Sequence, residues 1–422
     1  MKYNLYNKLG RGTTMIQLAS VLISFLLIPL LGRTKLKLSY ILLISAGVLA
    51  IISGIGFEDT AQSLAEVFKG SSLSTVLTIL MVSVLGGLMK HYKTLDKIVE
   101  TILLIVSSKK IILMIIPALI GILIIPGGAL LSAPFINNLG EEMNIAPPKR
   151  AAINLVFRHV AMFLLPFSTG LLVIASSMPE INITKLVMFN LAYVVPMFFV
   201  GYLLYIKNIE SEKSTLKKED VGRNFLKLLL YTSPITVCVI LNALTGLPFY
   251  ITMIVSVVCV YFLSDKKDFA KITIKSINWH TVLMVAIILL LKEMILKMDD
   301  LLLIFGNLFK QSNSTFSVLV IFLVSSVFFG IITGNQTAAL AIILPMVSQL
   351  NVAGNMLYIY VYFAFASAFI GYFFSPIHLC QAFTIQLMNV TTLELYKEYR
   401  YYLLFSLIVL FSSAFILTAI FA

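Results

Sequence analysis

Long apolar runs separated by short charged segments recur along almost the whole chain, and this repetition constrains the fold more than any other feature. Of the 422 residues, 59% are hydrophobic and only 12% are charged. A soluble domain cannot bury so much apolar surface, whereas a helix of about 20 apolar residues can cross the hydrocarbon core of a bilayer. The sequence therefore predicts an all-α polytopic membrane protein.

The strong positive charge of the chain has a membrane explanation. The formal net charge is +12, and the basic residues lie in short loops between apolar runs, as the positive-inside rule describes. This placement argues against a nucleic-acid partner. The three cysteines, Cys238, Cys259 and Cys380, lie far apart and match neither a disulfide framework nor the spacing of a metal site. Since Arg33, Lys35 and Lys37 follow the first apolar run in place of a small-residue cleavage site, we expect it to be a retained span.

The apolar runs predict about ten transmembrane helices. In the first half of the chain they lie at about 14–31, 38–56, 72–90, 147–177 and 184–206. In the second half they lie at about 224–242, 247–263, 278–296, 354–389 and 396–421. The fourth and the ninth runs are longer than a straight crossing needs, and each contains a proline, Pro166 or Pro376. Proline removes a helical hydrogen bond, so we expect both helices to unwind there.

Between the third and fourth spans of each half lies a pair of segments with another pattern. The segments 94–107 and 299–311 predict amphipathic helices at the membrane surface. The apolar stretches that follow, about 110–140 and 313–350, predict re-entrant hairpins. The arm 111–125 is only about 22 Å long at 1.5 Å per residue, which is too short to cross. The Pro126-Gly127-Gly128 turn should therefore lie inside the membrane.

The distribution of Lys and Arg favours hairpins over two further crossings. With hairpins, most of the basic residues outside the spans collect on one side, whereas with crossings they divide almost evenly. The positive-inside rule therefore selects hairpins. Both termini then lie outside, and the charged linker 207–223 is cytoplasmic. We expect the protein in a prokaryotic cytoplasmic membrane.

The two halves match in the order of their segments. Residues 1–206 contain three spans, a surface helix, a hairpin, a broken span and a final span, and residues 224–422 repeat this order. Because each half has an odd number of crossings, the second half enters the membrane in the opposite orientation. Inverted repeats of this kind are typical of secondary transporters that work by alternating access.

At this point the sequence resembles a known family. The five-span halves, each with a hairpin and a broken helix, are similar to the ion-transporter superfamily, which includes sodium–dicarboxylate symporters and gluconate permeases. The run from Pro126 to Pro134, Pro-Gly-Gly-Ala-Leu-Leu-Ser-Ala-Pro, resembles a permease branch near the gluconate permeases. The resemblance implies that substrate and coupling ion bind at hairpin tips and helix breaks, and that the protein forms a homodimer. Sodium–dicarboxylate members carry Ser-Asn-Thr at each tip, where this chain has Thr333-Gly334-Asn335-Gln336-Thr337 at the second.

Residues at the tips and inside the fourth span are the candidates for binding substrate. Glycine lets a ligand approach the backbone, and helix N-termini favour anions. An intramembrane arginine is costly and suits a carboxylate, with the alternative that Arg158 reaches the cytoplasmic interface. Asn154 could orient its guanidinium. The predicted substrate-binding residues are Gly127, Gly128, Ser132, Asn154, Arg158, Gly334, Asn335, Gln336 and Thr337.

A second set could bind a coupling ion. Hydroxyls and free carbonyls at unwound helices coordinate sodium in some transporters, and histidine can carry a proton near neutral pH. The same residues can also cap broken helices or pack without a ligand. The predicted ion-coupling residues are His159, Ser168, Thr169, Thr333, Ser375 and His378.

These patterns predict a secondary active transporter for a small organic anion, a carboxylate or sugar acid, coupled to sodium or protons. The alternative is a cation–proton antiporter that uses His159 or His378. We expect no enzyme activity and no cofactor, since neither a zinc-protease motif nor a nucleophile elbow is present. The sequence leaves open the substrate, the coupling ion, symport against antiport, and the oligomeric state.

Overall fold

The computed structural model describes residues 2–122, 129–210, 220–312, 314–350 and 352–421, and every regular element in these ranges is a helix. Seven of the described helices are long and apolar enough to cross a membrane by length and composition: Gly70–His91, Ile183–Ile206, Val221–Thr245, Trp279–Leu296, Thr315–Thr333, Gly354–Phe373 and Thr392–Phe421. The predicted all-α polytopic membrane protein is thus confirmed in outline. The count of ten spans stays a prediction.

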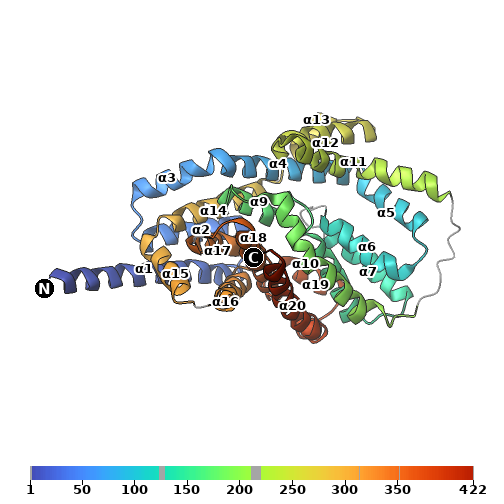
Figure 1. The fold of residues 1–422 in the computed structure, drawn as a ribbon. Helices are drawn as coiled ribbons and strands as arrows, with labels where there is room; N and C mark the ends of the chain where they lie inside the picture. Colours follow the sequence, from blue (N-terminus) through green and yellow to red (C-terminus); the bar gives the residue numbers. More distant parts are fainter. Residues whose placement is uncertain (1, 123–128, 211–219, 313, 351, 422) are drawn as a thin grey trace.

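The helices of each half follow in order (Figure 1). Those described in the first half are α1 (Lys2–Leu31), α2 (Leu38–Ile52), α3 (Phe57–Val67), α4 (Gly70–His91), α5 (Thr94–Ile105), α6 (Lys109–Ile122), α7 (Ala129–Glu142), α8 (Pro147–Ala161), α9 (Thr169–Ser177), α10 (Ile183–Gly201) and the π-helix η1 (Tyr202–Ile206). Those described in the second half are α11 (Val221–Thr245), α12 (Phe249–Leu263), α13 (Phe269–Lys275), α14 (Trp279–Leu296), α15 (Asp299–Lys310), α16 (Thr315–Thr333), α17 (Gln336–Val347), the 3₁₀ helix η2 (Ser348–Leu350), α18 (Gly354–Phe373), α19 (Leu379–Met388) and α20 (Thr392–Phe421).

Helices α5 and α15 occupy the two segments that the sequence assigns to amphipathic surface helices. In α5, Leu95, Ile98 and Ile102 are buried while Asp96 and Glu100 are exposed. Both helices begin with acidic residues in the first turn, where the positive end of the helix dipole favours them. The short helices α3 and α13 were not predicted, because their mixed polar sequences carry no apolar run.

The segments predicted as hairpins form two pairs of contacting helices, α6 with α7 and α16 with α17. Helix α6 has 14 residues, or about 21 Å at 1.5 Å per residue, which is less than the roughly 30 Å of the hydrocarbon core. Helix α16 has 19 residues and is long enough to cross on its own. The two pairs therefore differ in the length of their first arm. The expected turn at 126–128 lies outside the described residues.

Several contacts between the halves are reciprocal. Helix α4 contacts α12 while α14 contacts α2, and α5 contacts α11 while α15 contacts α1. In the same way α7 contacts α19 while α17 contacts α9, and α10 contacts α20. In each of these pairs, the two helices exchange roles with helices ten places away in the numbering, whereas the contacts of α1 with α16 and of α8 with α19 are not matched in this way. The inverted repeat stays a prediction, and the reciprocal pairs are consistent with it.

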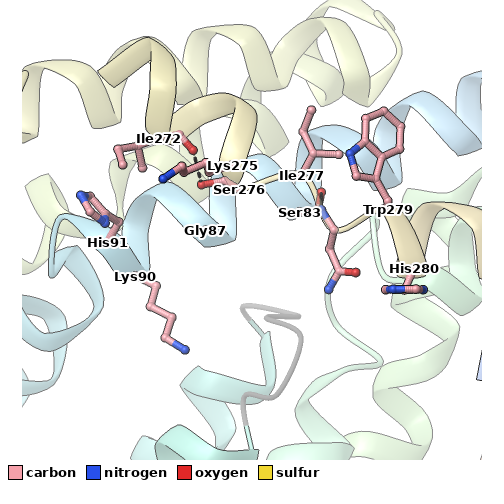
Figure 2. A pocket seen from close by; sticks show the side chains of 11 residues that line it. Ser83, Gly87, Lys90, His91, Ile272, Lys275, Ser276, Ile277, Trp279 and His280 are labelled. Carbon is pink, nitrogen blue, oxygen red and sulfur yellow. Dashed lines mark hydrogen bonds between the residues drawn. The ribbon is translucent and has the colours of Figure 1, made fainter. Parts of the chain in front are cut away.

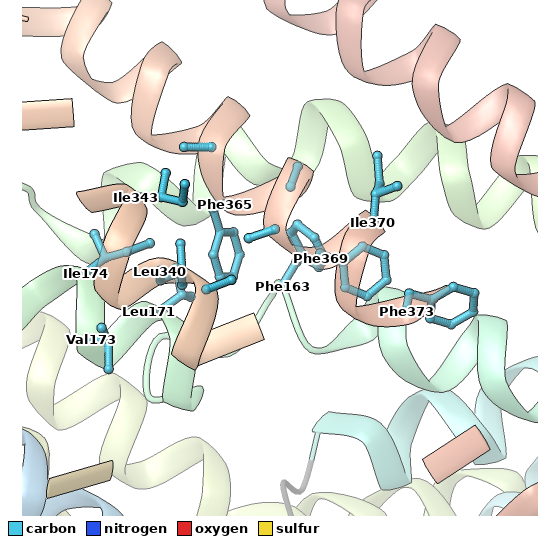
Figure 3. Packing of buried hydrophobic residues seen from close by; sticks show 14 of the residues in the cluster. Phe163, Leu171, Val173, Ile174, Leu340, Ile343, Phe365, Phe369, Ile370 and Phe373 are labelled. Carbon is cyan, nitrogen blue, oxygen red and sulfur yellow. The ribbon is translucent and has the colours of Figure 1, made fainter. Parts of the chain in front are cut away.

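The core of the protein lies around α18 and the first helix break. The apolar window of α18 is 89% buried inside the protein, whereas that of α11 is 11% buried, so α18 is central and α11 is peripheral. Figure 3 shows Phe163, Phe365 and Phe369 meeting between the first break and α18. Phe163 packs against Phe365 and Phe369 with ring centroids 4.8 Å apart in both pairs. These edge-on contacts fix the break against the central helix.

Candidate functional site

Two helix breaks lie at the prolines expected from the sequence. Helix α8 ends at Ala161 and α9 begins at Thr169, so the first break contains Pro166. Helix α18 ends at Phe373 and α19 begins at Leu379, so the second contains Pro376. Such breaks leave backbone carbonyls without helical donors, which inside a membrane must find other partners.

Side chains from the following helices satisfy one carbonyl at each break. The Nδ2 atom of Asn190 in α10 donates to the carbonyl of Phe163 at 3.2 Å. The hydroxyl of Tyr396 in α20 donates to the carbonyl of Phe374 at 3.0 Å. The two breaks are thus stabilised in the same way, each by a side chain from the helix that follows α9 or α19 in the chain.

The turn between α16 and α17 packs against the second break. Gly334 has a φ of +55°, and a Cβ atom there would lie 2.6 Å from Cγ1 of Ile377. Ser375 donates from Oγ to the carbonyl of Ile331 at 2.6 Å, which also joins the break to α16. Only glycine satisfies both the left-handed backbone and this close approach.

The polar side chains of this turn already have partners within the protein. Thr333 donates from Oγ1 to the carbonyls of Phe329 and Asn335. The Oδ1 atom of Asn335 accepts from the Ala338 amide at 3.0 Å and caps α17. Gln336 donates from Nε2 to the carbonyl of Phe365 at 3.0 Å. The hydrogen bonds of Thr333 and Asn335 thus stabilise the turn, and that of Gln336 joins the turn to α18.

We expect Asn335→Ala to lower the free energy of unfolding by about 1 kcal/mol, because the N-cap of α17 would be lost. Asn335→Asp should retain the cap, since its carboxylate also accepts from the Ala338 amide. Thermal unfolding of the purified variants would check this. Equal unfolding temperatures for the two variants would contradict the cap assignment.

Arg158 is buried in α8, and the described part of the chain gives it no counter-ion. Its exposed fraction is 6%, and its Nε and Nη1 atoms have no hydrogen-bond partner among the described residues. The ion pairs found in the described residues do not include it. Arg150, two turns earlier, pairs with Glu141 at 2.8 Å. The side chain of Arg158 is thus enclosed by protein, and the alternative in which it reaches the cytoplasmic interface stays open.

Two histidines lie beside Arg158. His159 follows it in α8, and His378 ends the second break, and both are 1% exposed. Their ring centroids are 4.8 Å apart, so residues more than 200 positions apart in the sequence meet here. The ring centroid of Tyr372 lies 4.2 Å from the ring centroid of His378.

Asn154 joins the two halves at the same place. Its Nδ2 atom donates to Oγ1 of Thr384 in α19 at 3.1 Å, so the contact the structure gives it is with α19 and not with Arg158. Its Oδ1 atom and Oε1 of Gln381 are buried without partners among the described residues. Sequence reasoning missed Gln381 and Thr384. Their three-residue spacing after His378, which predicts one polar helix face, could have identified them.

The remaining described residues of the predicted site lie in or beside α7, α9 and α17. Ser168 directly precedes the first turn of α9, and its side chain is buried, with an exposed fraction of 3%. Its Oγ atom has no partner among the described residues. Thr169 is half-buried beside it, Thr337 is 6% exposed in α17, and Ser132 is buried in α7. Gly127 and Gly128 lie outside the described residues.

A glycine of α6 lies against the backbone of Arg158. A Cβ atom on Gly121 would lie 2.0 Å from the carbonyl oxygen of Arg158. In the second half, a Cβ atom on Gly330 of α16 would lie 2.8 Å from the carbonyl oxygen of Ala368 in α18. In both halves, therefore, a glycine lets the first arm approach the helix that precedes the break. Close approach through small residues is a common packing mode of membrane helices.

A basic cavity of about 850 Å³ lies between α4, α13 and α14. Figure 2 shows Lys90 on α4 and His280 on α14 at opposite sides of this space. Lys275 and His91 also line it, and the described lining residues include no carboxylate. Such a cavity raises the local concentration of anions.

Comparison with known proteins places the chain in a family. Among curated protein sequences, none matches this chain. A family model described as "Protein of unknown function (DUF401)" matches residues 16–420. As that match covers almost the whole sequence, the chain belongs to the DUF401 family.

Proposed function

We propose that the protein is a secondary active transporter that carries a small organic anion, a carboxylate or sugar acid, by alternating access. The observation that supports this most directly is Arg158, buried with free N–H groups and no described carboxylate partner. A buried guanidinium is costly unless an anion compensates it. Its planar N–H groups match the two oxygens of a carboxylate. A ligand that brings its own negative charge would complete the site.

The reciprocal contacts of the two halves support the transport mechanism. Counterpart helices exchange places in the reciprocal contact pairs named above, as expected for two repeats that cross the membrane in opposite directions. Arg158 comes from the first half, whereas His378 and Gln381 come from the second. Movement of one half against the other would therefore change the surroundings of a bound anion and open the site to each side in turn.

The positive charge of the residues around the candidate site weighs against the alternative of a cation–proton antiporter. Cations that enter beside His159 and His378 would meet the guanidinium of Arg158, and the described residues place no carboxylate in an ion pair with it. The basic cavity lined by Lys90 and Lys275 would also repel them. Transport of an anion fits both observations.

Coupling to sodium or protons remains part of the proposal. Ser168 is a candidate for binding a cation, because its Oγ atom has no partner among the described residues. Thr333 and Ser375 donate their hydroxyl protons to main-chain carbonyls, which leaves oxygen lone pairs that can also face a cation. His159 and His378 are the candidates for proton coupling. Membership of the ion-transporter superfamily, a homodimeric state, a cytoplasmic membrane and external termini stay predictions.

Uptake into proteoliposomes would test the proposal. We expect a panel of radiolabelled sugar acids and dicarboxylates to contain a substrate whose uptake needs an imposed sodium or proton gradient. Sugars of the same size without a carboxylate should not enter. Gradient-driven uptake of a cation in exchange for protons, with no anion transported, would instead establish the antiporter.

A further inference from the structure

Three metal-binding side chains from the two halves converge next to Arg158. The ligand atoms of His159, His378 and Cys380 all lie within 4.8 Å of one another. Metal–nitrogen and metal–sulfur bonds of about 2.0–2.3 Å place two ligand atoms at most about 4.5 Å apart. Small side-chain rotations would therefore bring all three onto one ion. The spacing of these residues in the sequence gives no sign of such a cluster.

Backbone carbonyls lie beside Nδ1 of both imidazoles, which leaves Nε2 of each available to a metal ion. Nδ1 of His159 lies 2.7 Å from the Leu155 carbonyl, and Nδ1 of His378 lies 3.4 Å from the Phe373 carbonyl. A carbonyl can only accept, so each Nδ1 carries the proton and each Nε2 keeps its lone pair. Nε2 of His378 is buried and has no partner among the described residues. Backbone carbonyls orient ligand histidines in this way in known metal sites.

Charge decides which ion the cluster suits. A divalent ion bound with one thiolate would leave a net positive charge beside the buried guanidinium of Arg158, which is costly. A monovalent ion with one thiolate is neutral. Thiolate and imidazole are also the ligands that favour soft ions such as Cu(I). We propose that His159, His378 and Cys380 form a site for a soft monovalent metal ion, Cu(I) or Ag(I).

Binding there would link the two halves. His159 belongs to α8, while His378 and Cys380 belong to the second break and α19. An ion held by all three would restrain α8 against α19, next to Arg158. If the protein transports anions as proposed, occupation of this site should therefore inhibit transport. The metal site itself does not depend on that function.

Silver binding to the purified full-length protein in detergent would test the site, because Ag⁺ does not change oxidation state under these conditions. Cys238 and Cys259, in α11 and α12, are first replaced by serine so that their thiols do not bind the probe. We expect one Ag⁺ per chain in this Cys238→Ser/Cys259→Ser background. Cys380→Ser should abolish this binding. His378→Gln and His159→Gln should each weaken it at least 10-fold.

Control measurements distinguish a variant that has lost a metal ligand from a variant that has not folded. Metal-free thermal unfolding should show that each variant is folded. X-ray absorption of the silver complex should show sulfur and nitrogen ligands together. Unchanged silver affinity in both folded histidine variants would overturn the proposal, and so would equal affinity for Zn²⁺ and Ag⁺.

A transport assay provides a second, independent readout. In proteoliposomes, Ag⁺ should inhibit anion uptake by the Cys238→Ser/Cys259→Ser protein and leave the additional Cys380→Ser variant active. Equal inhibition of both would overturn the link between metal binding and movement. Failure to find any transported anion would count against the proposed function alone, because silver binding is measured without transport.

Discussion

Arg158→Gln is expected to weaken anion binding strongly and at the same time to make the protein more stable. The guanidinium is buried, its Nε and Nη1 atoms have no partner among the described residues, and it has no described counter-ion. Removing an uncompensated buried charge should raise the free energy of unfolding by about 2–3 kcal/mol. Anion affinity should fall at least about 30-fold, because truncating one partner of a buried charge pair costs about 2–5 kcal/mol.

Arg150→Gln is the matched control for this prediction. Arg150 lies in the same helix and is equally buried, but it pairs with Glu141. Its replacement should lower the free energy of unfolding, because Glu141 loses its partner. Anion affinity should stay within about threefold of the unchanged protein, because Arg150 pairs with a carboxylate of the protein and not with the anion. Isothermal titration with the substrate found by uptake, together with thermal unfolding, would measure both effects. Anion binding by Arg158→Gln at the affinity of the unchanged protein would refute the role of Arg158.

Gly121→Ala should separate α6 from α8 at the candidate site. The added Cβ atom would lie 2.0 Å from the carbonyl oxygen of Arg158, a backbone atom that cannot turn aside. Overpacking typically costs about 1–3 kcal/mol and occasionally more, and we expect a value at or above the upper end here. Because the displaced backbone carries Arg158, the folded fraction should also lose anion transport.

Gly47→Ala provides the comparison, because no heavy atom lies within 4 Å of the corresponding Cβ position in α2. Alanine there should be neutral or slightly stabilising, as expected from its helix propensity. Thermal unfolding and uptake assays on both variants would measure the difference. Equal stability of the two variants would show that α6 does not lie against α8 as the structure has it.

The lengths and breaks of the helices could be predicted from the sequence because they have local causes. Apolar runs predicted the helices α4, α10 and α14 to within a few residues, since length and hydropathy decide whether a segment crosses a membrane. Pro166 and Pro376 predicted the two breaks because each removes a helical hydrogen bond within a run longer than one crossing needs. Pro196 and Pro234, in runs of ordinary length, lie inside continuous helices. The short helices α3 and α13 were missed because their sequences are mixed.

The make-up of the candidate site could be predicted only in part. Arg158, His159 and His378 were identified because charged or titratable residues are rare within apolar segments. The sequence could not give the partners of these residues. Asn154 bonds Thr384, 230 positions away, and not the neighbouring Arg158. Gly121 was missed because the backbone it contacts belongs to another helix.

The sequence by itself thus determined that the chain is a membrane-embedded bundle of helices with two proline breaks. Those features follow from apolar length and from proline, which act within a single segment. The tertiary structure alone decided that Arg158 lacks a described counter-ion and that His159 meets His378 and Cys380. Such relations depend on how the two halves pack against each other. A contact between two helices that are distant in the chain leaves no periodic pattern in the sequence of either helix.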